Sequence, residues 1–325
     1  MTEHTKLEKL VFAHPRWKAL STIAKKQIED INKSSKNELK KTKEKKALAQ
    51  VLKKQRQEIL DSICEEIVAQ LSDQELMQSV LDIYSQTVEE YTQNPHTQYI
   101  TDDLAKFMLD PRIHNNARVL DIGCGPGRDS FFMFYNHLKF REIFMERKDG
   151  EGKTTLEKFG VPRKKFKTIG IDGSPEMIKI ANKKAALLRI RFSTTDQPFF
   201  ICKDIHNIKF NYPTEFDAVW ACASLFTHTP RNLIEPAIES IVNLMKTNGI
   251  FFLSYTHGAN KPYNKLLLSS TGRIKWFSQP NPEEIVSIAQ KYGLIQIEDS
   301  KFDDYRKGKD IKKDMFVSHF FQKTR

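Results

Sequence analysis

An aspartate followed by three alternate glycines forms the stretch of this sequence best suited to bind a ligand. Asp121 ends a short apolar run, and Gly123, Gly125 and Gly127 follow it. This pattern is typical of a buried strand, a tight turn and the start of a helix. A ligand can lie directly against glycine, which has no Cβ, and the first N–H groups of the helix point toward it. The stretch predicts a nucleotide-type loop. Arg128 stands where the dinucleotide fingerprint requires a glycine, which argues against NAD.

Two further acids follow apolar runs later in the chain. Asp172 ends the run at residues 167–172, and Asp204 comes just after the run at residues 199–202. A carboxylate at the first position can accept hydrogen bonds from both hydroxyls of a ribose, and one at the second can accept from an exocyclic amine. Asp121 would attract an ammonium or sulfonium charge. Each acid by itself has an ordinary structural explanation, but three acids in this order predict one binding crevice.

Apolar runs that alternate with helical patterns predict an open α/β sheet for most of the chain, with ligands at the carboxyl ends of its strands. Helices are expected at residues 101–109, after the glycines, after Ser174 and Pro175, from Thr229 to about residues 247–249, and after Asn281. The predicted strands are residues 119–121, 167–172, 199–202, 216–221, 250–255, 294–297 and 315–321.

The first 83 residues predict a helical extension. They hold one proline and no glycine, and they are rich in good helix formers. Apolar residues recur at steps of three and four between residues 60 and 71, and Ser72 with Glu75 forms a capping box that opens another helix. Two or three packed helices are expected here.

A basic segment lies within this extension. Residues 36–56 carry nine Lys or Arg against two acids, whereas the whole chain has a net charge of +11. A solvated helix or linker is one interpretation, and a surface that binds nucleic acid or an acidic protein is the other.

The composition predicts a cytoplasmic protein that does not enter a membrane. No apolar run approaches the roughly 20 residues of a membrane span, and residues 1–10 lack a secretory signal. The four cysteines are not arranged as Cys-x-x-Cys, so reduced thiols are expected and no metal site is. They are Cys64, Cys124, Cys202 and Cys222.

The spacing between the glycine loop and Asp172 is longer than usual, which indicates an insertion between them. Asp172 follows Gly127 by 45 residues, against about 20 in a typical unit of this kind. The excess falls at about residues 141–165, a charged stretch with three glycines. Such a surface insertion is either decoration or part of a substrate surface.

Taken in order, these motifs resemble those of the class I S-adenosylmethionine-dependent methyltransferases. The matching segments are residues 119–127, 169–177, 202–205, 216–221 and 244–250. Within that superfamily, residues 84–91, 127–130 and 223–228 look most similar to bacterial small-molecule-type members related to the tellurite-resistance group.

The resemblance implies a Rossmann-like, mostly parallel seven-stranded sheet flanked by helices, with the last strand antiparallel between the fifth and sixth. Residues 84–325 would form this methyltransferase domain and residues 1–83 the helical extension. The implied cofactor is S-adenosylmethionine, with S-adenosylhomocysteine as product. Arg128 would meet the cofactor carboxylate or lie solvated in the first helical turn. The implied cofactor-binding residues are Asp121, Gly123, Cys124, Gly125, Gly127, Arg128, Asp172, Gly173, Ser174, Asp204, Ile205 and Cys222.

The methyl acceptor is less well defined. His228, just past the fourth strand, is placed to face the transferred methyl and is the candidate catalytic residue, with a structural role as the alternative. The candidate acceptor-pocket residues are Tyr84, Tyr91, Tyr255 and His257. The sequence lacks the Asn/Asp-Pro-Pro-Tyr motif of amino-adenine and glutamine methylases, and Cys222 lacks the preceding proline of a cytosine-C5 nucleophile.

Three functions therefore remain open. The first is methyl transfer to a small molecule. The second is methylation of RNA or protein, in which the basic helices bind the substrate. The third is a non-catalytic S-adenosylmethionine-binding interaction protein, which ranks last because no acid or glycine of the loop is missing.

Overall fold

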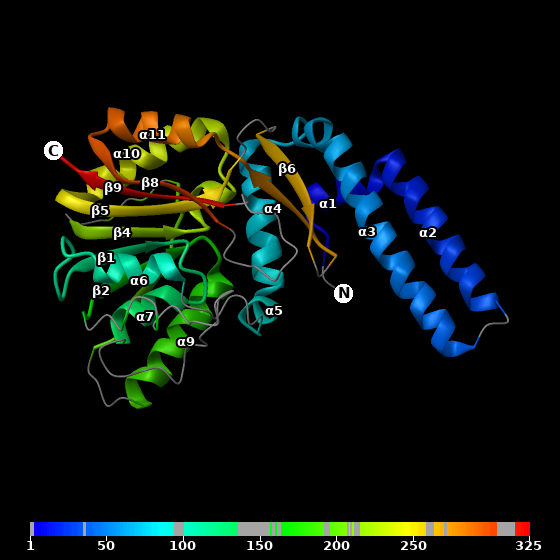
Figure 1. The fold of residues 1–325 in the computed structure, drawn as a ribbon, viewed down its shortest axis with the longest axis horizontal. Helices are drawn as coiled ribbons and strands as arrows, with labels where there is room; N and C mark the ends of the chain where they lie inside the picture. Colours follow the sequence, from blue (N-terminus) through cyan, green and yellow to red (C-terminus); the bar gives the residue numbers. More distant parts are fainter. Residues whose placement is uncertain are drawn as a thin grey trace. The chain divides into compact units, whose positions relative to one another are not determined.

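The chain folds into two compact units in a computed structural model (Figure 1). The helical unit comprises residues 1–83 and 262–277, and the sheet unit comprises residues 84–261 and 278–325. The structure describes residues 3–34, 37–93, 101–135, 157, 160, 164–191, 196–206, 208, 210, 215–257, 263–269, 272–303 and 316–325. The predicted insertion at residues 141–165 lies outside them, apart from residues 157, 160, 164 and 165.

The sheet unit contains a seven-stranded sheet in the order β3-β2-β1-β4-β5-β9-β8. β9 runs antiparallel between β5 and β8, while the pairs among β3, β2, β1, β4 and β5 are parallel. The predicted sheet, including its antiparallel last strand, is confirmed. The strands are β1 (Arg118–Ile122), β2 (Lys167–Asp172), β3 (Phe199–Cys202), β4 (Phe216–Cys222), β5 (Met245–Thr256), β8 (Leu294–Asp303) and β9 (Phe316–Lys323).

Helices flank the sheet, and α6, α9 and α11 begin at the predicted caps. The helix predicted to start at Thr229 begins instead at Ile234, after the 3-10 turn at Arg231–Leu233. Thr101 accepts a hydrogen bond from the N–H of Leu104, and Asn281 accepts one from Glu283. α9 packs against β2 and β3, and α11 packs against β8 (Figure 1). The helices are α5 (Val88–Gln93), α6 (Asp102–Leu109), α7 (Arg128–Tyr135), α9 (Pro175–Arg191), α10 (Ile234–Leu244) and α11 (Pro282–Lys291), with 3-10 turns η4 (Leu225–Thr227) and η5 (Arg231–Leu233).

The helix before β5 is shorter than the sequence predicts. α10 ends at Leu244, and Met245 already pairs with Phe216 of β4. Asn248 then takes a positive φ of 66°, and a Cβ on Gly249 would lie 2.8 Å from a backbone oxygen. These residues form a tight turn inside the strand, rather than a helix end.

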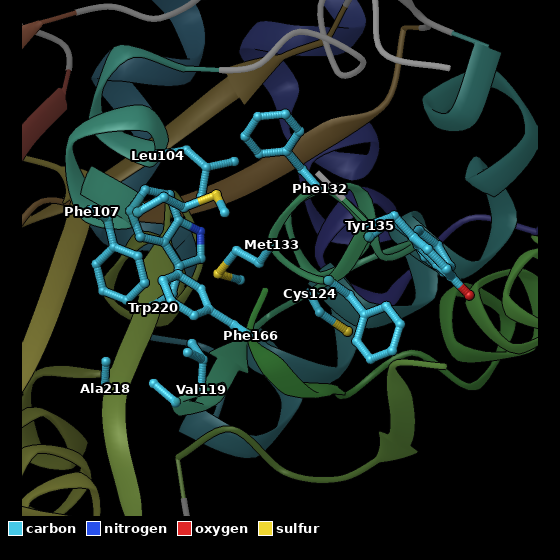
Figure 2. Packing of buried hydrophobic residues seen from close by; sticks show 14 of the residues in the cluster. Leu104, Phe107, Val119, Cys124, Phe132, Met133, Tyr135, Phe166, Ala218 and Trp220 are labelled. Carbon is cyan, nitrogen blue, oxygen red and sulfur yellow. The ribbon is translucent and has the colours of Figure 1, made fainter. Parts of the chain in front are cut away.

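The core between the sheet and its helices is largely aromatic (Figure 2). Trp220 of β4 stacks on Phe252 of β5 at 4.0 Å between ring centroids, and Phe107 of α6 lies 5.0 Å from Trp220. Val119 and Ala218 are buried on the same side of the sheet as Trp220. This contiguous packing holds β1, β4 and β5 against α6 and α7, and so fixes the strand ends at which the predicted loop lies.

The helical unit holds more helices than expected, together with an unpredicted β-hairpin. Four helices replace the expected two or three because the chain is extended at His14 and Ser34 and leaves the helix again after Val68. Residues 262–277 group with these helices and not with the sheet. The elements are α1 (Lys6–Ala13), α2 (Pro15–Lys33), α3 (Glu38–Val68), most of α4 (Asp73–Gln86), and the hairpin strands β6 (Asn264–Leu268) and β7 (Ile274–Ser278).

A buried ion pair joins α1 to this hairpin. Glu8, whose side chain is completely buried, accepts hydrogen bonds from Nε and Nη2 of Arg273 at 2.7 and 2.8 Å. It also accepts from the N–H groups of Ile274 and Thr5. Burial by itself would raise the pKa of Glu8, but the bonds from Arg273 and from the backbone outweigh it and hold the pKa below its usual value. The carboxylate therefore stabilises the folded unit in its ionised form.

We expect Glu8→Gln to lower the free energy of unfolding by about 3–5 kcal/mol at pH 7, because the substitution leaves the Arg273 guanidinium buried without a counter-charge. Glu8→Gln combined with Arg273→Met should recover most of this loss. Since the pKa of Glu8 is lowered on folding, its contribution is present above its unfolded value of 4.5 and is lost as the pH falls below that value. Urea unfolding of the full chain measures these changes. A single variant within about 1 kcal/mol of wild type, on the scale of an exposed pair, would contradict the role of this pair.

Candidate functional site

The glycine loop between β1 and α7 is held against the end of β2. The N–H groups of Gly123 and Cys124 both donate to the carbonyl of Ile171, at 2.8 and 3.0 Å. Gly123, Gly125 and Gly127 have positive φ values of 67°, 52° and 85°, which side chains rarely adopt. The loop therefore has the tight conformation that the sequence predicts.

The three glycines are required for different reasons. A Cβ on Gly123 would lie 2.3 Å from Cβ of Ser224, and one on Gly127 would lie 2.7 Å from the rings of Phe131 and Phe200. The nearest atom to a Cβ on Gly125 is 4.0 Å away, on the ring of Tyr91. Gly123 and Gly127 thus allow close packing, whereas Gly125 leaves open backbone that a ligand can approach.

Asp172 links this loop to the start of α9. Its carboxylate accepts hydrogen bonds from the N–H of Gly125 at 3.0 Å and from that of Ser174 at 2.8 Å. Burial raises the pKa of Asp172, and the two hydrogen bonds partly offset the increase. Ser174 caps α9 at Met177, and its hydroxyl lies 2.9 Å from that of Ser85 near the end of α4. The structure therefore brings together the predicted loop, Asp172 and Ser174.

Asp121 is a buried acid at the end of β1. It is 3% exposed and accepts a hydrogen bond from the hydroxyl of Ser130 at 2.6 Å. Burial, followed by the charge on Asp129, raises the pKa of Asp121 to about 8, and Asp172 adds to the increase. Asp129 and Asp172 thus both act on Asp121, and a cation bound beside Asp121 would favour its ionised form.

Asp129 organises the first turn of α7, and sequence reasoning missed it. Its carboxylate accepts two hydrogen bonds from Arg128, at 2.5 and 2.8 Å, and one from the indole N–H of Trp220 at 2.9 Å. Burial disfavours the charged guanidinium, but the Asp129 carboxylate more than compensates and raises the pKa of Arg128. Arg128 is therefore held in place by an ion pair and is not free in solvent. The sequence did contain an indication that Asp129 is buried, because it lies in the first turn of a helix whose following residues are mostly apolar.

Arg128 keeps hydrogen-bonding capacity beyond this ion pair. A guanidinium has five N–H groups, and the two bonds to Asp129 use Nε and Nη2. The Arg128 side chain is 24% exposed, so it reaches the surface of the site. Such a fixed, planar cation is well suited to bind a carboxylate.

Three of the predicted acceptor residues form an aromatic cluster. The hydroxyl of Tyr84 lies 3.3 Å from Nε2 of His228, and the Tyr84 ring contacts those of Tyr91 and His228 edge-on, at 5.9 and 5.8 Å between centroids. Burial and the neighbouring Tyr84 raise the pKa of Tyr91, so it remains a neutral phenol. Since Tyr91 also borders Gly125, this cluster adjoins the glycine loop.

The other two predicted acceptor residues lie elsewhere. Tyr255 is completely buried in the core, where its hydroxyl lies 2.9 Å from Nε2 of His319 and its ring contacts Phe226. His257 is 4% exposed, and its carbonyl accepts a hydrogen bond from Gln279. Neither residue lines an open surface, because both side chains are buried.

Asp204 and its neighbour Ile205 follow β3, as predicted. The Asp204 side chain is 60% exposed and accepts a hydrogen bond from the N–H of His206 at 2.8 Å. Ile205 is half-buried. Nε2 of His206 lies 2.8 Å from the hydroxyl of Thr229, so this loop is tied to the segment after His228. Asp204 thus faces solvent with acceptor capacity remaining.

The cysteines near the loop are neutral thiols. Burial, together with the charge on Asp129, raises the pKa of Cys222 to about 12, although Arg128 acts in the opposite direction. Burial and the nearby acids Asp121 and Asp172 raise the pKa of Cys124 well above its usual value. The sulfur of Cys202 lies 3.8 Å from the carbonyl of Gly173. Because thiolates are the reactive form, none of these observations indicates a nucleophilic cysteine.

Two other kinds of site are absent from the part of the chain that the structure describes. No group of three or more His, Cys, Asp or Glu among those residues is arranged to hold a metal ion. No described helix combines the length and apolar character needed to cross a bilayer.

The sheet order and the loop after β1 define a Rossmann-like α/β protein, with the glycine loop and Asp172 at the carboxyl ends of β1 and β2. The family model of the methyltransferase domain matches residues 113–292, which is more than half of the chain. The chain therefore belongs to the methyltransferase domain family, and the predicted class of enzyme is confirmed.

Solved structures share this fold at low sequence identity. Magnesium protoporphyrin IX methyltransferase from Synechocystis, with S-adenosylmethionine bound, has a TM-score of 0.50 and 13% identity over 78% of this chain and 98% of its own. The same enzyme with S-adenosylhomocysteine gives 0.50 and 14%, over 78% and 100%. A TehB-like methyltransferase from Corynebacterium glutamicum gives 0.43 and 16%, over 75% and 98%. No curated protein sequence matches the chain.

We expect Asp121→Asn to stabilise the sheet unit increasingly as the pH rises from about 4 to 8. The unfolded wild-type chain releases this proton near pH 3.8, whereas the folded chain keeps it to about pH 8, so wild type loses stability over this range. Asparagine has no such proton and still accepts from Ser130. Between pH 4 and pH 8 the difference in melting temperature between the variant and wild type should increase by at least about 2–4 °C, which corresponds to about 1 kcal/mol of stability. Asp196→Asn, at an exposed acid, is the matched control. A difference that does not change with pH would contradict the buried, protonated state.

Proposed function

We propose that this methyltransferase transfers a methyl group from S-adenosylmethionine to a small-molecule acceptor. The observation that carries this proposal is the convergence of a positive-φ glycine loop with Asp121 and Asp172 at the ends of β1 and β2 and with Asp129 at the start of α7. A ligand can approach the loop backbone at Gly125, which has no Cβ, and the acids favour a cationic ligand. The sheet unit would be the catalytic domain, with its boundary near residue 84 and residues 262–277 outside it.

The residues present suit the parts of this cofactor. A Cβ on Gly125 would meet no atom nearer than the Tyr91 ring at 4.0 Å, so the methionine part can lie against this glycine. Asp121 would interact with its positive charge and Arg128 with its carboxylate. Asp172 would accept from the ribose hydroxyls and Asp204 from the adenine amine, with Ile205 packing beside it. Gly123, Cys124, Gly127, Gly173, Ser174 and Cys222 would complete the walls of the cofactor site.

When it is bound, this cofactor supplies a methyl group already activated by the sulfonium. The protein therefore has to position the acceptor in line and exclude water. The half-buried cluster of Tyr84, Tyr91 and His228 borders the loop and is the proposed acceptor pocket. In the tautomer with Nε2 protonated, His228 donates to the Tyr84 hydroxyl, which orients the ring. Nδ1 then carries the lone pair, and His228 is the proposed general base for an acceptor that carries a proton.

Other acceptors and partners belong to the same proposal as alternatives. An RNA or protein acceptor would be bound by the basic segment at residues 36–56. The enzyme is proposed to work in the cytoplasm, and the free state of its four cysteines is consistent with a reducing compartment.

We expect S-adenosylmethionine and S-adenosylhomocysteine to raise the melting temperature. At a hundredfold excess over Kd the gain is about 2.7 kcal/mol, or about 5–10 °C. Asp172→Ala should remove most of this shift, because the carboxylate both holds Gly125 and contacts the ligand. Asp196→Ala, at an exposed acid, should keep it. A wild-type protein that shows no shift with either ligand at millimolar concentration would refute the cofactor assignment.

We expect His228→Ala to lower methyl transfer by at least about a hundredfold while the thermal shift with S-adenosylmethionine persists. Tyr84→Phe should give a smaller decrease, since the histidine remains but loses its partner. The assay follows labelled methyl groups from the cofactor into cell lysate, with and without ribonuclease and protease, and His114→Ala at an exposed histidine is the control. Label that disappears from the product on ribonuclease or protease treatment would exclude the small-molecule acceptor.

A further inference from the structure

One side of α3 carries a row of exposed lysines. Lys40, Lys43, Lys46 and Lys53, here called the lysine row, are all exposed. They follow one another at steps of three, three and seven residues, so each is a neighbour of the next on the helix surface and together they span an arc of about 140° around the helix. At about 1.5 Å per residue the row is about 20 Å long.

Few acids oppose this row. The acids of α3 near it are Glu38 and Glu44, and the next one along the helix is Glu58. Glu38 pairs with Lys41 at 3.2 Å, and Glu58 lies 3.8 Å from Lys54. Within the described residues, no member of the lysine row forms an ion pair with an acid. The row is therefore a linear array of positive charge.

The opposite side of α3 is already occupied. Leu52 is buried with Leu20 and Ala24 of α2, and Leu48 and Ile59 pack against this cluster. α2 and α3 lie side by side along this contact (Figure 1). The packing leaves the lysine side as the surface available to a partner.

The chemistry of this surface fits a nucleic-acid backbone better than a lipid or a protein. An interfacial helix needs a continuous exposed apolar face. Leu48, Leu52 and Ile59 of α3 pack in the cluster with α2, and the exposed Leu39 and Val51 are 12 residues apart and do not form such a face. Protein interfaces are depleted in lysine and rely on aromatic anchors, and α3 contains no aromatic residue. Flexible point charges in a row match the regularly spaced phosphates of a polynucleotide.

Details of the surface favour a duplex with A-form geometry. Single strands are bound by stacking on aromatic side chains, which α3 lacks. Because the lysines span an arc of about 140° around α3, the helix can contact the phosphates of both strands when it lies across the narrow major groove of an A-form duplex, whereas the major groove of B-DNA is roughly 12 Å wide. The deep, narrow major groove of RNA excludes side chains, so proteins contact its phosphates from outside. We propose that the lysine row of α3 binds the phosphate backbone of double-stranded RNA. This binding is independent of the proposed methyl transfer and does not make RNA the acceptor.

The test is fluorescence anisotropy with the full chain and a 20-base-pair RNA duplex of mixed sequence, in about 50–300 mM KCl. Four phosphate contacts predict that log K falls with log salt with a slope of about −3 to −4. The variant K40Q/K43Q/K46Q/K53Q should bind at least about tenfold more weakly at 100 mM salt, with a flatter slope. A DNA duplex of the same sequence, the single RNA strands and phosphatidylserine vesicles should all bind more weakly than the RNA duplex.

A matched variant separates this surface from net charge. K179Q/K183Q/R189Q/R191Q removes four exposed cations from α9 and should keep the affinity of wild type. Circular dichroism and the melting temperature check that both variants fold, and the shift with S-adenosylmethionine should be unchanged in the α3 variant. The proposal would be overturned if wild type did not bind the RNA duplex, or if it bound DNA, single strands or vesicles equally well. It would also be overturned if the α3 variant kept the affinity of wild type, or if both variants lost affinity equally.

Discussion

The hydrogen bond from the indole N–H of Trp220 to the carboxylate of Asp129 connects the core of the sheet unit to its ligand site. Trp220 is fixed by stacking on Phe252 and by contact with Phe107, so the indole has little freedom. Its N–H donates a hydrogen bond to the Asp129 carboxylate, and this carboxylate forms an ion pair with Arg128 next to the glycine loop. The position of a surface cation is thus set by aromatic packing within the sheet. Preorganisation of this kind avoids the entropy cost of ordering a long side chain when a ligand binds.

The acids of the site illustrate how ligand binding and stability conflict. Asp129 and Asp172 both disfavour the ionisation of Asp121, and burial raises the pKa of Asp121 and of Asp172. Without a bound cation, these neighbouring acids do not stabilise the folded chain. The arrangement is explained by a ligand that carries a positive charge, which would both stabilise the ionised acids and be held by them.

The helical unit depends on a different kind of constraint. The hairpin of β6 and β7 is far from α1 in sequence, but Arg273 and Ile274 both bond to the buried carboxylate of Glu8. Gln57 of α3 adds bonds to the backbone of Leu266 and Leu268. A segment inserted after β5 is in this way incorporated into the N-terminal helices, and polar bonds set its register.

Local patterns in the sequence were enough to predict the sheet, the loop and the order of the acids. Alternating apolar runs and glycine positions act over a few residues, so the amino-acid sequence alone places Asp121, Asp172 and Asp204 at strand ends. Boundaries were less certain, as the early end of α10 at Leu244 shows. A tight turn within β5 depends on pairing with β4, which local propensity does not contain.

Only the tertiary structure decided which residues meet across long stretches of chain. It brought Tyr84 to His228, and it buried Tyr255 in the core against His319 of β9 and Phe226. It also revealed Asp129, whose partner Trp220 is 91 residues away. The sequence by itself determined the elements and the chemical types at their ends. The contacts among those elements depend on packing and on buried hydrogen bonds between distant residues, and these form only when the chain is folded.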